Sequence, residues 1–272
     1  MDVKFDAIGF WVMDVKTIYY NDELNDEFST AVITPKKIDE NYKYIHKSVW
    51  KKFTHFFWYR IIATPLAFLY LKIKFGHKIK NKRVIKSVKN TGWFIYGNHT
   101  HHMADAFIPT MLSTPKDMYV IVHPNNVSMP YLGRVTPSLG ALPLPDDAAA
   151  AKNFIKAVEQ RIHEKNAVTI YPEAHIWPFY TKIRPFRDTS FRYPISCDVP
   201  VFCFTNTYQK RKFRKTPRIV TYVDGPFYPD EKLGGKEKRA DLRDRVYQTM
   251  TMRTKNNNVE LVKYIKAGES ND

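Results

Sequence analysis

Residues Trp93–Asp105 read WFIYGNHTHHMAD, and this stretch decides the fold. A short apolar run ends in a turn that holds three histidines, and a carboxylate follows at Asp105. A strand that ends in a turn and feeds a helix exposes its last residues at the carboxyl edge of an open α/β sheet, where ligands usually bind. The segment Ala167–Glu173 has the same character, apolar and β-branched up to Pro172 and then acidic at Glu173. If the two strands are parallel, their ends meet in one cleft.

The rest of the chain alternates strand-like and helical patterns. Apolar residues recur at helical spacing from residue 148 to residue 165, and again at Leu242, Val246 and Met250. This alternation predicts an α/β fold with a mainly parallel sheet flanked by helices. The remaining strand-like runs, rich in Val, Ile, Phe and Tyr, are Met118–Val122, Val199–Phe204 and Arg218–Val223.

Composition limits the class of protein and its partners. The chain has 272 residues, of which 44% are hydrophobic, enough for one large domain with a buried core. The formal net charge of +16 predicts an anionic partner, either nucleic acid or anionic lipid. Cys197 and Cys203 lack a metal-ligand spacing and indicate a reducing compartment. The first residues, Met1–Asp6, lack the features of a signal peptide, so we expect a protein that is not exported.

Residues 53–71 read FTHFFWYRIIATPLAFLYL, which is nearly long enough to cross a bilayer. Arg60 and Pro65 interrupt the run, so two interpretations remain: an amphipathic helix buried against the sheet, or a monotopic, interfacial helix pair. Dense aromatic residues with lysines at both ends are unusual for a core helix, so we favour contact with an anionic phospholipid membrane surface. The flanking lysines are Lys51, Lys52, Lys72 and Lys74.

These patterns divide the chain into three parts. Residues 1–45 form a polar lead of unknown role, residues 46–75 form an interfacial helical segment, and residues 76–272 form the α/β domain. The oligomeric state cannot be predicted from the sequence.

Four motifs follow one another between residues 93 and 204. They are Asn98-His99 with Asp105, the run from Met129 to Leu144, Tyr171-Pro172-Glu173-Ala174, and Val199-Pro200-Val201. In this order they resemble the lysophospholipid acyltransferase family, of the 1-acylglycerol-3-phosphate acyltransferase type. Pro185-Phe186-Arg187 is similar to the Pro-Phe-Lys of that family. Four ordered motifs are far more specific than any one of them alone.

The resemblance implies a catalytic pair. An alcohol attacks a thioester poorly unless a base removes its proton as the bond forms, and His99 is the family's candidate for that base. Asp105 would hold the other imidazole nitrogen and stabilise the imidazolium. The separation of His99 and Asp105 is one residue longer than in the family, which leaves His101, four residues before Asp105, as an alternative base. We prefer His99 because it directly follows the strand.

The resemblance also implies substrate-binding residues. Two arginines of the family pattern are absent here, so phosphate binding falls to Lys182, Arg184 and Arg187, while Glu173 would bind the acceptor's glycerol or hold an arginine. The implied enzyme is an O-acyltransferase without metal or cofactor. It would move a fatty acyl chain from acyl-CoA or acyl-carrier protein to a lysophospholipid, with 1-acylglycerol 3-phosphate as the first candidate acceptor and phosphatidic acid as product. It would be a peripheral or monotopic protein at the cytoplasmic face of a membrane.

Three alternatives remain at the level of sequence. In the first alternative, the enzyme is an acyltransferase whose acceptor is glycerol 3-phosphate or another lyso-lipid rather than 1-acylglycerol 3-phosphate. A metal site would use His99, His101, His102 and Asp105, although no second ligand cluster accompanies them. A nucleic-acid-binding module would use the basic, aromatic strip Tyr208–Lys215, but nucleic-acid-binding signatures are absent and we expect no nucleic-acid partner.

Overall fold

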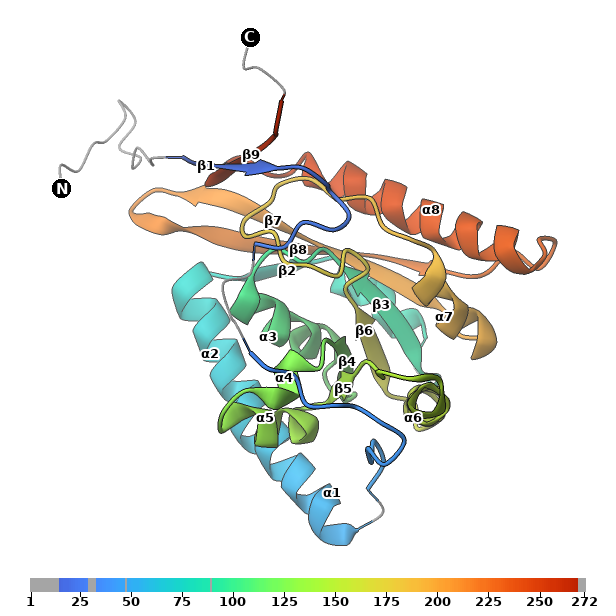
Figure 1. Cartoon of the computed structure of the whole chain (residues 1–272). Helices are drawn as coiled ribbons and strands as arrows, with labels where there is room; N and C mark the ends of the chain where they lie inside the picture. The colour runs from blue at the N-terminus through green and yellow to red at the C-terminus, as the bar shows by residue number, and fades with distance from the viewer. Residues whose placement is uncertain (1–14, 29–32, 47, 89, 269–272) are drawn as a thin grey trace.

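A computed structural model describes residues 15–28, 33–46, 48–88 and 90–268 of the chain. Its main sheet, within these residues, has seven strands, drawn in Figure 1. They are β2 (Lys78–Lys80), β3 (Trp93–Gly97), β4 (Met118–Val122), β5 (Ala141–Pro143), β6 (Ala167–Ile170), β7 (Val201–Arg211) and β8 (Arg214–Phe227). Their order across the sheet is β2-β8-β7-β3-β6-β4-β5.

The sheet is mainly parallel, as predicted. Strand β3 pairs in parallel with both β6 and β7, and β4 pairs in parallel with β5 and β6. Trp93 lies opposite Ala167 in the β3–β6 register, so the two strands run side by side from their first residues. Their carboxyl ends therefore meet at one edge, which is the juxtaposition that the two sequence motifs require.

The β7–β8 pair is the antiparallel exception. The apolar runs Val199–Phe204 and Arg218–Val223 are only the inner part of these strands. The ladder continues through polar residues until Arg211 lies opposite Arg214. Apolar patterning alone could not predict this extension, because its buried residues Thr205, Asn206 and Thr207 are polar and its last residues are only partly buried.

Helices cover both faces of the sheet (Figure 1). On one face, Trp93 and Ile95 of β3 pack in a core cluster with α2 and α3, while Phe94 and Tyr96 pack on the other face with α6 and α8. This alternation follows from the two-residue period of a strand. The helices are α1 (Val49–Phe56), η1 (Phe57–Ala63), α2 (Thr64–Phe75), η2 (Lys82–Ser87), α3 (His102–Ser113), α4 (Asn125–Ser128), α5 (Leu132–Val135), η3 (Thr136–Leu139), α6 (Ala148–His163), η4 (Thr189–Phe191), α7 (Arg192–Ser196) and α8 (Gly235–Thr254).

Helices α1, η1 and α2 join into one continuous helix, Val49–Phe75, of 27 residues. The sequence predicted a pair of helices in this segment, and that prediction is wrong because the helix is continuous. Pro65 does not break the helix because it stands in the first turn of α2, just after the π-helical turn η1. In this region the Tyr59 carbonyl oxygen accepts both the Thr64 backbone N–H and the Thr64 hydroxyl, the latter at 2.7 Å. Within the described residues this helix is long and apolar enough to cross a membrane.

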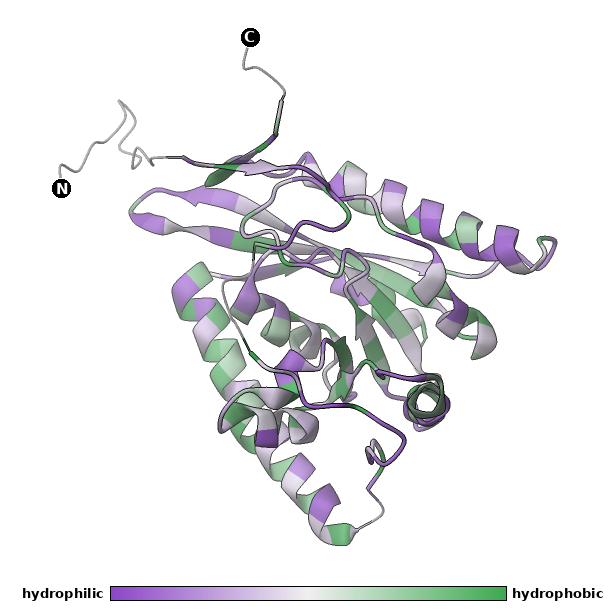
Figure 2. Ribbon diagram, viewed as in Figure 1, coloured by the Kyte–Doolittle hydropathy of each residue, from purple (hydrophilic) through white to green (hydrophobic). Residues whose placement is uncertain are grey.

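The long helix has a buried face and an exposed apolar face. Tyr59, Ala67, Leu71 and Phe75 pack into the core. Large apolar side chains also point outward, along the green patches of α1 and α2 in Figure 2. We call this set the outer helix face; it consists of Val49, Trp50, Phe53, Phe56, Phe57, Trp58, Ile61, Leu66, Phe68, Leu69 and Ile73.

The described part of the N-terminal lead packs onto the domain. Strand β1 (Lys16–Tyr20) pairs in parallel with β9 (Val262–Lys266) to form a separate two-stranded sheet. Ile38 is fully buried, and its backbone N–H donates to the Asp146 carboxylate at 2.5 Å. The lead thus contributes to the core, a role that its polar composition did not predict.

Candidate active site

The turn between β3 and α3 folds around the carboxylate of Asp105. This side chain is 1% exposed, and its Oδ2 accepts hydrogen bonds from His99 Nδ1 at 2.9 Å and from the backbone N–H groups of Thr100 and His101 at 2.8 Å each. Helix α3 begins at His102, so the extra residue of the His99–Asp105 spacing lies in the turn, before the helix. The longer spacing therefore still brings the imidazole to the carboxylate.

The hydrogen bond to Asp105 sets the tautomer of His99. A carboxylate accepts, so Nδ1 carries the proton and Nε2 keeps its lone pair. The imidazole stacks on the ring of Tyr171 at 4.3 Å between centroids, and the Tyr171 hydroxyl donates to the backbone carbonyl of Asp105. The His99 side chain is 18% exposed, which leaves it open to a substrate from one side. This is the geometry of an oriented general base.

Two asparagines hold the carboxyl edge together. Asn98 donates to the Asn206 carbonyl at 3.1 Å and accepts from the Asn206 N–H at 2.8 Å, which ties β3 to β7. The Asn206 side-chain amide also donates to Asp105 Oδ1 at 3.3 Å. Sequence reasoning missed Asn206 because a single asparagine in a strand-like run carries no motif.

His101 has a different environment from His99. It precedes the first residue of α3, and its Nδ1 accepts the Ala104 N–H at 3.2 Å, which caps the helix. Its ring lies against the rings of Phe75 at 4.9 Å and Phe179 at 5.3 Å. Burial lowers the pKa of His101, and the nearby Asp105 opposes this shift. A neutral His101 with its Nδ1 occupied carries its proton on Nε2.

The histidine cluster does not converge on one point. His99 bonds Asp105, His101 caps α3, and His102 is exposed on the first turn of the helix. Throughout the described ranges, no group of three or more His, Cys, Asp or Glu side chains is placed to hold a metal ion.

Glu173 and Arg184 form a buried pair next to the backbone of His99. Glu173 Oε2 accepts the His99 N–H at 2.9 Å, and Oε1 accepts the Arg184 N–H at 3.0 Å. The Arg184 guanidinium, which is 0% exposed, lies 3.7 Å from the carboxylate and donates to the carbonyl oxygens of Glu23, Glu173 and His175. Burial raises the pKa of Glu173, while Arg184 and the two backbone donors oppose the rise. The geometry gives both side chains a positioning role: they fix the backbone of His99.

Lys182 and Arg187 lie on the loop that follows Glu173, on either side of Arg184 in the sequence. Both side chains are exposed, and neither forms an ion pair within the described residues. The structure thus brings Glu173 against the backbone of the turn between β3 and α3, which carries His99 and which we call the catalytic turn. It buries Arg184, whereas Lys182 and Arg187 remain at the surface. Their role in substrate binding stays a prediction.

The N-terminal lead covers the loop that follows Glu173. Trp177 is fully buried, its indole N–H donates to the Asp26 carbonyl at 2.8 Å, and Tyr20 and Phe28 contact its ring. The Trp177 N–H in turn donates to the His99 carbonyl at 3.1 Å. Residues before the long helix therefore support the catalytic turn, a contact between distant segments that no local pattern could predict.

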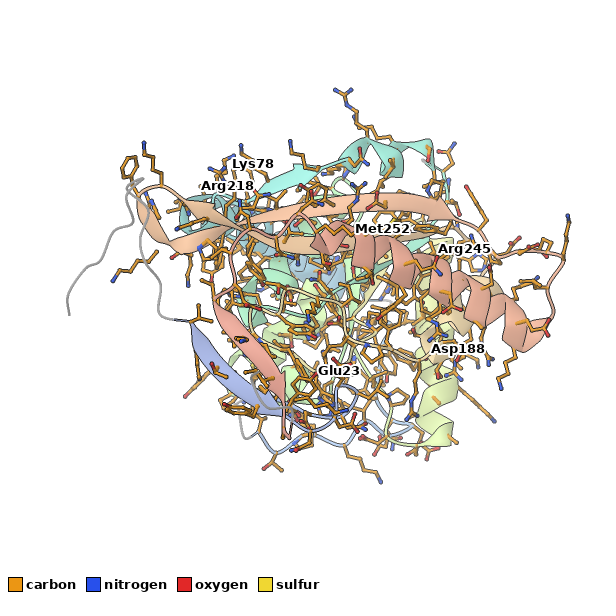
Figure 3. All side chains as sticks on the ribbon, turned by 90° about the horizontal axis from the view of Figure 1, so that it is seen from above. Glu23, Lys78, Asp188, Arg218, Arg245 and Met252 are labelled. Atoms are coloured by element: carbon orange, nitrogen blue, oxygen red, sulfur yellow. The ribbon has the colours of Figure 1, made fainter. Side chains whose placement is uncertain are left out.

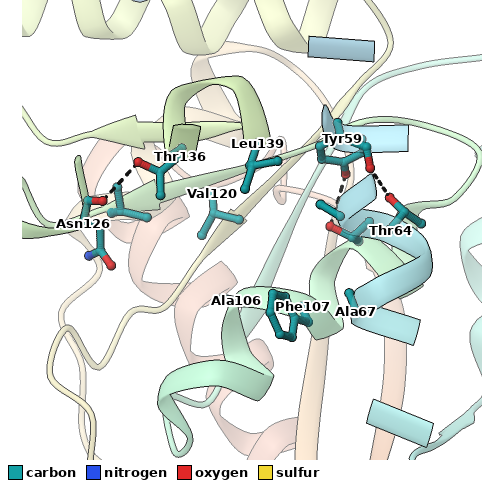
Figure 4. A pocket seen from close by; sticks show the side chains of 13 residues that line it. Tyr59, Thr64, Ala67, Ala106, Phe107, Val120, Asn126, Thr136 and Leu139 are labelled. Carbon is teal, nitrogen blue, oxygen red and sulfur yellow. Dashed lines mark hydrogen bonds between the residues drawn. The ribbon is translucent and has the colours of Figure 1, made fainter. Parts of the chain in front are cut away.

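An apolar pocket of about 140 Å3 lies beside the His99–Asp105 pair, between the long helix, α3 and the β4–β5 edge of the sheet (Figure 4). Neither His99 nor Asp105 lines it. Its lining includes Ala106, the residue that follows Asp105, together with Phe107 of α3 and Ala67 of α2. The other lining residues are Tyr59, Ala63, Thr64, Thr110, Val120, Val122, Asn126, Thr136, Leu139 and Ala141.

Comparisons with known proteins found a matching family model and a similar fold. The family model described as acyltransferase matches residues 77–205, which contain the whole catalytic turn and Glu173. No curated protein matches the chain. A similar solved structure is the crystal structure of the 1-acyl-sn-glycerophosphate (LPA) acyltransferase, PlsC, from Thermotoga maritima. It is 16% identical, with a TM-score of 0.51, over 77% of this chain and 81% of that one. The matching family model agrees with the acyltransferase family predicted from the sequence, and the likeness to PlsC shows a shared fold.

Proposed function

We propose that the protein transfers a fatty acyl chain from an acyl thioester to the free hydroxyl of a lysophospholipid, with 1-acylglycerol 3-phosphate as the acceptor and phosphatidic acid as the product. The observation that carries the proposal is the hydrogen-bonded pair of His99 and Asp105, within a domain of the acyltransferase family. The His99 side chain is 18% exposed, and its Nε2 has no hydrogen-bond partner among the described residues.

In the proposed reaction, His99 Nε2 takes the proton of the acceptor hydroxyl while the oxygen attacks the thioester carbonyl. Asp105 stabilises the imidazolium that forms. The tetrahedral intermediate then collapses, the carbon–sulfur bond breaks, and the imidazolium returns the proton to the leaving thiolate. The acceptor hydroxyl replaces an enzyme nucleophile, so no acyl-enzyme forms.

Geometry supports His99 rather than His101 as the base. His101 Nδ1 already accepts a backbone N–H, so its lone pair is engaged in the cap of α3. His99 instead donates through Nδ1 and leaves Nε2 open. The backbone N–H groups of His99, Thr100 and His101 are all bonded to Glu173 or Asp105, so donors for the oxyanion must come from elsewhere.

A product screen tests the proposal. Purified protein is incubated with 1-acylglycerol 3-phosphate, glycerol 3-phosphate and other lyso-lipids, with acyl-CoA or acyl-carrier protein as donor, and products are read by mass spectrometry. Phosphatidic acid formed from 1-acylglycerol 3-phosphate is the expected result. Product from glycerol 3-phosphate alone would reassign the acceptor, and no product from any pair would overturn the enzyme proposal.

The apolar pocket gives the acyl chain a place beside the base. Its lining is almost wholly apolar and starts next to Asp105, and each methylene removed from water contributes about 0.8 kcal/mol. We expect Ala67→Phe, which fills the pocket, to lower kcat/KM for long-chain donors about tenfold or more while short-chain donors are retained. Ala149→Phe, an exposed position of α6, is the matched control. Equal losses for short and long chains would place the acyl chain outside this pocket.

The outer helix face supports membrane contact, for which we propose the cytoplasmic face. Each of the four exposed lysines Lys51, Lys52, Lys72 and Lys74 contributes about 1 kcal/mol of attraction near an anionic surface. Changing all four to Gln is expected to release the protein from anionic vesicles at moderate salt, while activity in detergent remains. The control changes four exposed lysines to Gln, two in α6, one in the turn before α8 and one in α8: Lys152, Lys156, Lys232 and Lys236. Equal release by both variants would show an effect of net charge alone.

A further inference from the structure

The tip of the β7–β8 hairpin is a basic surface that the acyl-transfer site does not use. In Figure 1 the hairpin extends past the end of α2 at the left of the molecule. Phe213, in the turn, is 75% exposed, and the Lys212 ammonium lies 5.4 Å from the centre of its ring. A large exposed aromatic side chain among cations is typical of a surface that enters a membrane interface.

Three arginines gather behind this tip at the C-terminal end of α2. A Cβ built on Gly76 would lie 3.5 Å from Arg218 Nε and 3.6 Å from Arg211 Cζ, so two guanidinium groups approach one point. Arg211 also donates to the Lys74 carbonyl at 2.8 Å. Figure 3 shows Arg218 beside Lys78, in agreement with the pairing of β2 with β8.

No carboxylate of the described residues neutralises the three arginines of this cluster. Among the residues that the structure describes, Arg211, Arg214 and Arg218 have no carboxylate partner, and Arg218 Nε is buried without a hydrogen bond. Burial and the charges of Arg214 and Arg218 lower the pKa of Arg211. A bound anion would relieve this repulsion, and guanidinium groups bind phosphate through charge-assisted hydrogen bonds.

The cluster lies further along β7 than the catalytic turn. Tyr208, whose hydroxyl lies 2.8 Å from the Thr100 hydroxyl, marks where β7 passes the catalytic turn. Arg211 lies three residues further along β7, about 10 Å at the rise of a strand. The phosphorus of a lysophosphatidic acid is only a few bonds from its free hydroxyl, so an anion at the arginines is a different molecule from the acceptor.

The cluster is instead continuous with the outer helix face. Lys72 and Lys74, at the end of that face, are exposed, and Lys74 contacts Arg211 through its carbonyl. We propose that the hairpin tip is a second membrane contact, in which Arg211, Arg214 and Arg218 bind the phosphates of an anionic phospholipid bilayer and Phe213 enters its interface. The two contacts would fix the orientation of the enzyme, whereas one helix alone leaves it free to rotate about its axis.

Vesicle binding tests this proposal on the full chain. The variant Arg211→Gln/Arg214→Gln/Arg218→Gln is compared with wild type and with a control of equal net charge, Lys156→Gln/Lys232→Gln/Lys236→Gln, by sedimentation with phosphatidylcholine vesicles with and without phosphatidylglycerol. At about 1 kcal/mol per charge, the arginine variant is expected to bind anionic vesicles on the order of a hundredfold more weakly, and the control much less so. Phe213→Ser, which keeps every arginine, is expected to lose about tenfold.

Activity in detergent micelles separates this proposal from the acyl-transfer proposal, because it does not depend on vesicle binding. We expect the arginine variant to retain the wild-type KM for the acceptor in micelles. A raised acceptor KM there would make the cluster part of the substrate site and overturn the proposal. Unchanged vesicle binding by the arginine variant would also overturn it. If the variant binds RNA more weakly than wild type does but binds vesicles equally well, the cluster is a nucleic-acid site and the proposal is likewise overturned. A change in the circular dichroism spectrum of the triple variant would shift the test to Phe213→Ser.

Discussion

His99→Ala and Asp105→Asn are each expected to reduce turnover by at least about a hundredfold with the fold intact. The first change removes the only imidazole in the turn whose Nε2 lone pair is free, because His101 caps α3. The second replaces an acceptor of four hydrogen bonds with a group that also donates, so the imidazole loses its tautomer and orientation. Steady-state turnover in micelles measures both effects.

His102→Ala is the control for this pair of variants. His102 is exposed on the first turn of α3, so its loss is expected to leave turnover within about twofold of wild type, as for most surface substitutions. Circular dichroism and thermal unfolding of Asp105→Asn separate a catalytic defect from a collapsed turn. An inactive His101→Ala with an active His99→Ala would move the base to His101 and refute the assignment.

The parts of the fold that depend on local patterns were predictable. Apolar β-branched runs found the inner strands, and helical spacing found the stripe Leu242, Val246 and Met250 of α8, all of which are fully buried. The parallel relation of β3 and β6 followed from the alternation of strands with helices. The outer hairpin and the straight helix through Pro65 did not follow. The first continues through buried but polar residues that apolar patterning does not detect, and the second contains a π-helical turn that composition does not signal.

The candidate site also has a part that the sequence could predict and a part that it could not. His99 and Asp105 were predictable because a strand, a turn and a helix bring them together within seven residues. The support of the turn was not, since it joins Glu173, Arg184, Trp177 and the N-terminal lead across long separations in sequence. Arginine after a motif indicates phosphate binding in a sequence, but the burial of Arg184 depends on packing that only the structure reveals.

The second large effect is expected at Glu173. Glu173→Ala leaves the fully buried Arg184 charge without its carboxylate and the N–H groups of His99 and Arg184 without an acceptor. Removal of one partner from a buried pair costs about 3–5 kcal/mol, so the free energy of unfolding is expected to fall by that amount. Urea denaturation measures it. Glu164→Ala is the control, since its ion pair with Arg161 is on the surface and exposed pairs contribute about 0–1 kcal/mol.

Glu173→Gln distinguishes a positioning role from direct contact with the acceptor. The amide oxygen of Gln can accept only one of the two backbone N–H groups, and the buried Arg184 charge remains uncompensated. If Glu173 positions the catalytic turn, stability and kcat fall together while the acceptor KM stays near the wild-type value. If Glu173 also binds the acceptor's glycerol, the acceptor KM rises as well. The second outcome would return Glu173 to the substrate-binding role that the sequence motif implies, and would require that its two backbone donors open when the acceptor binds.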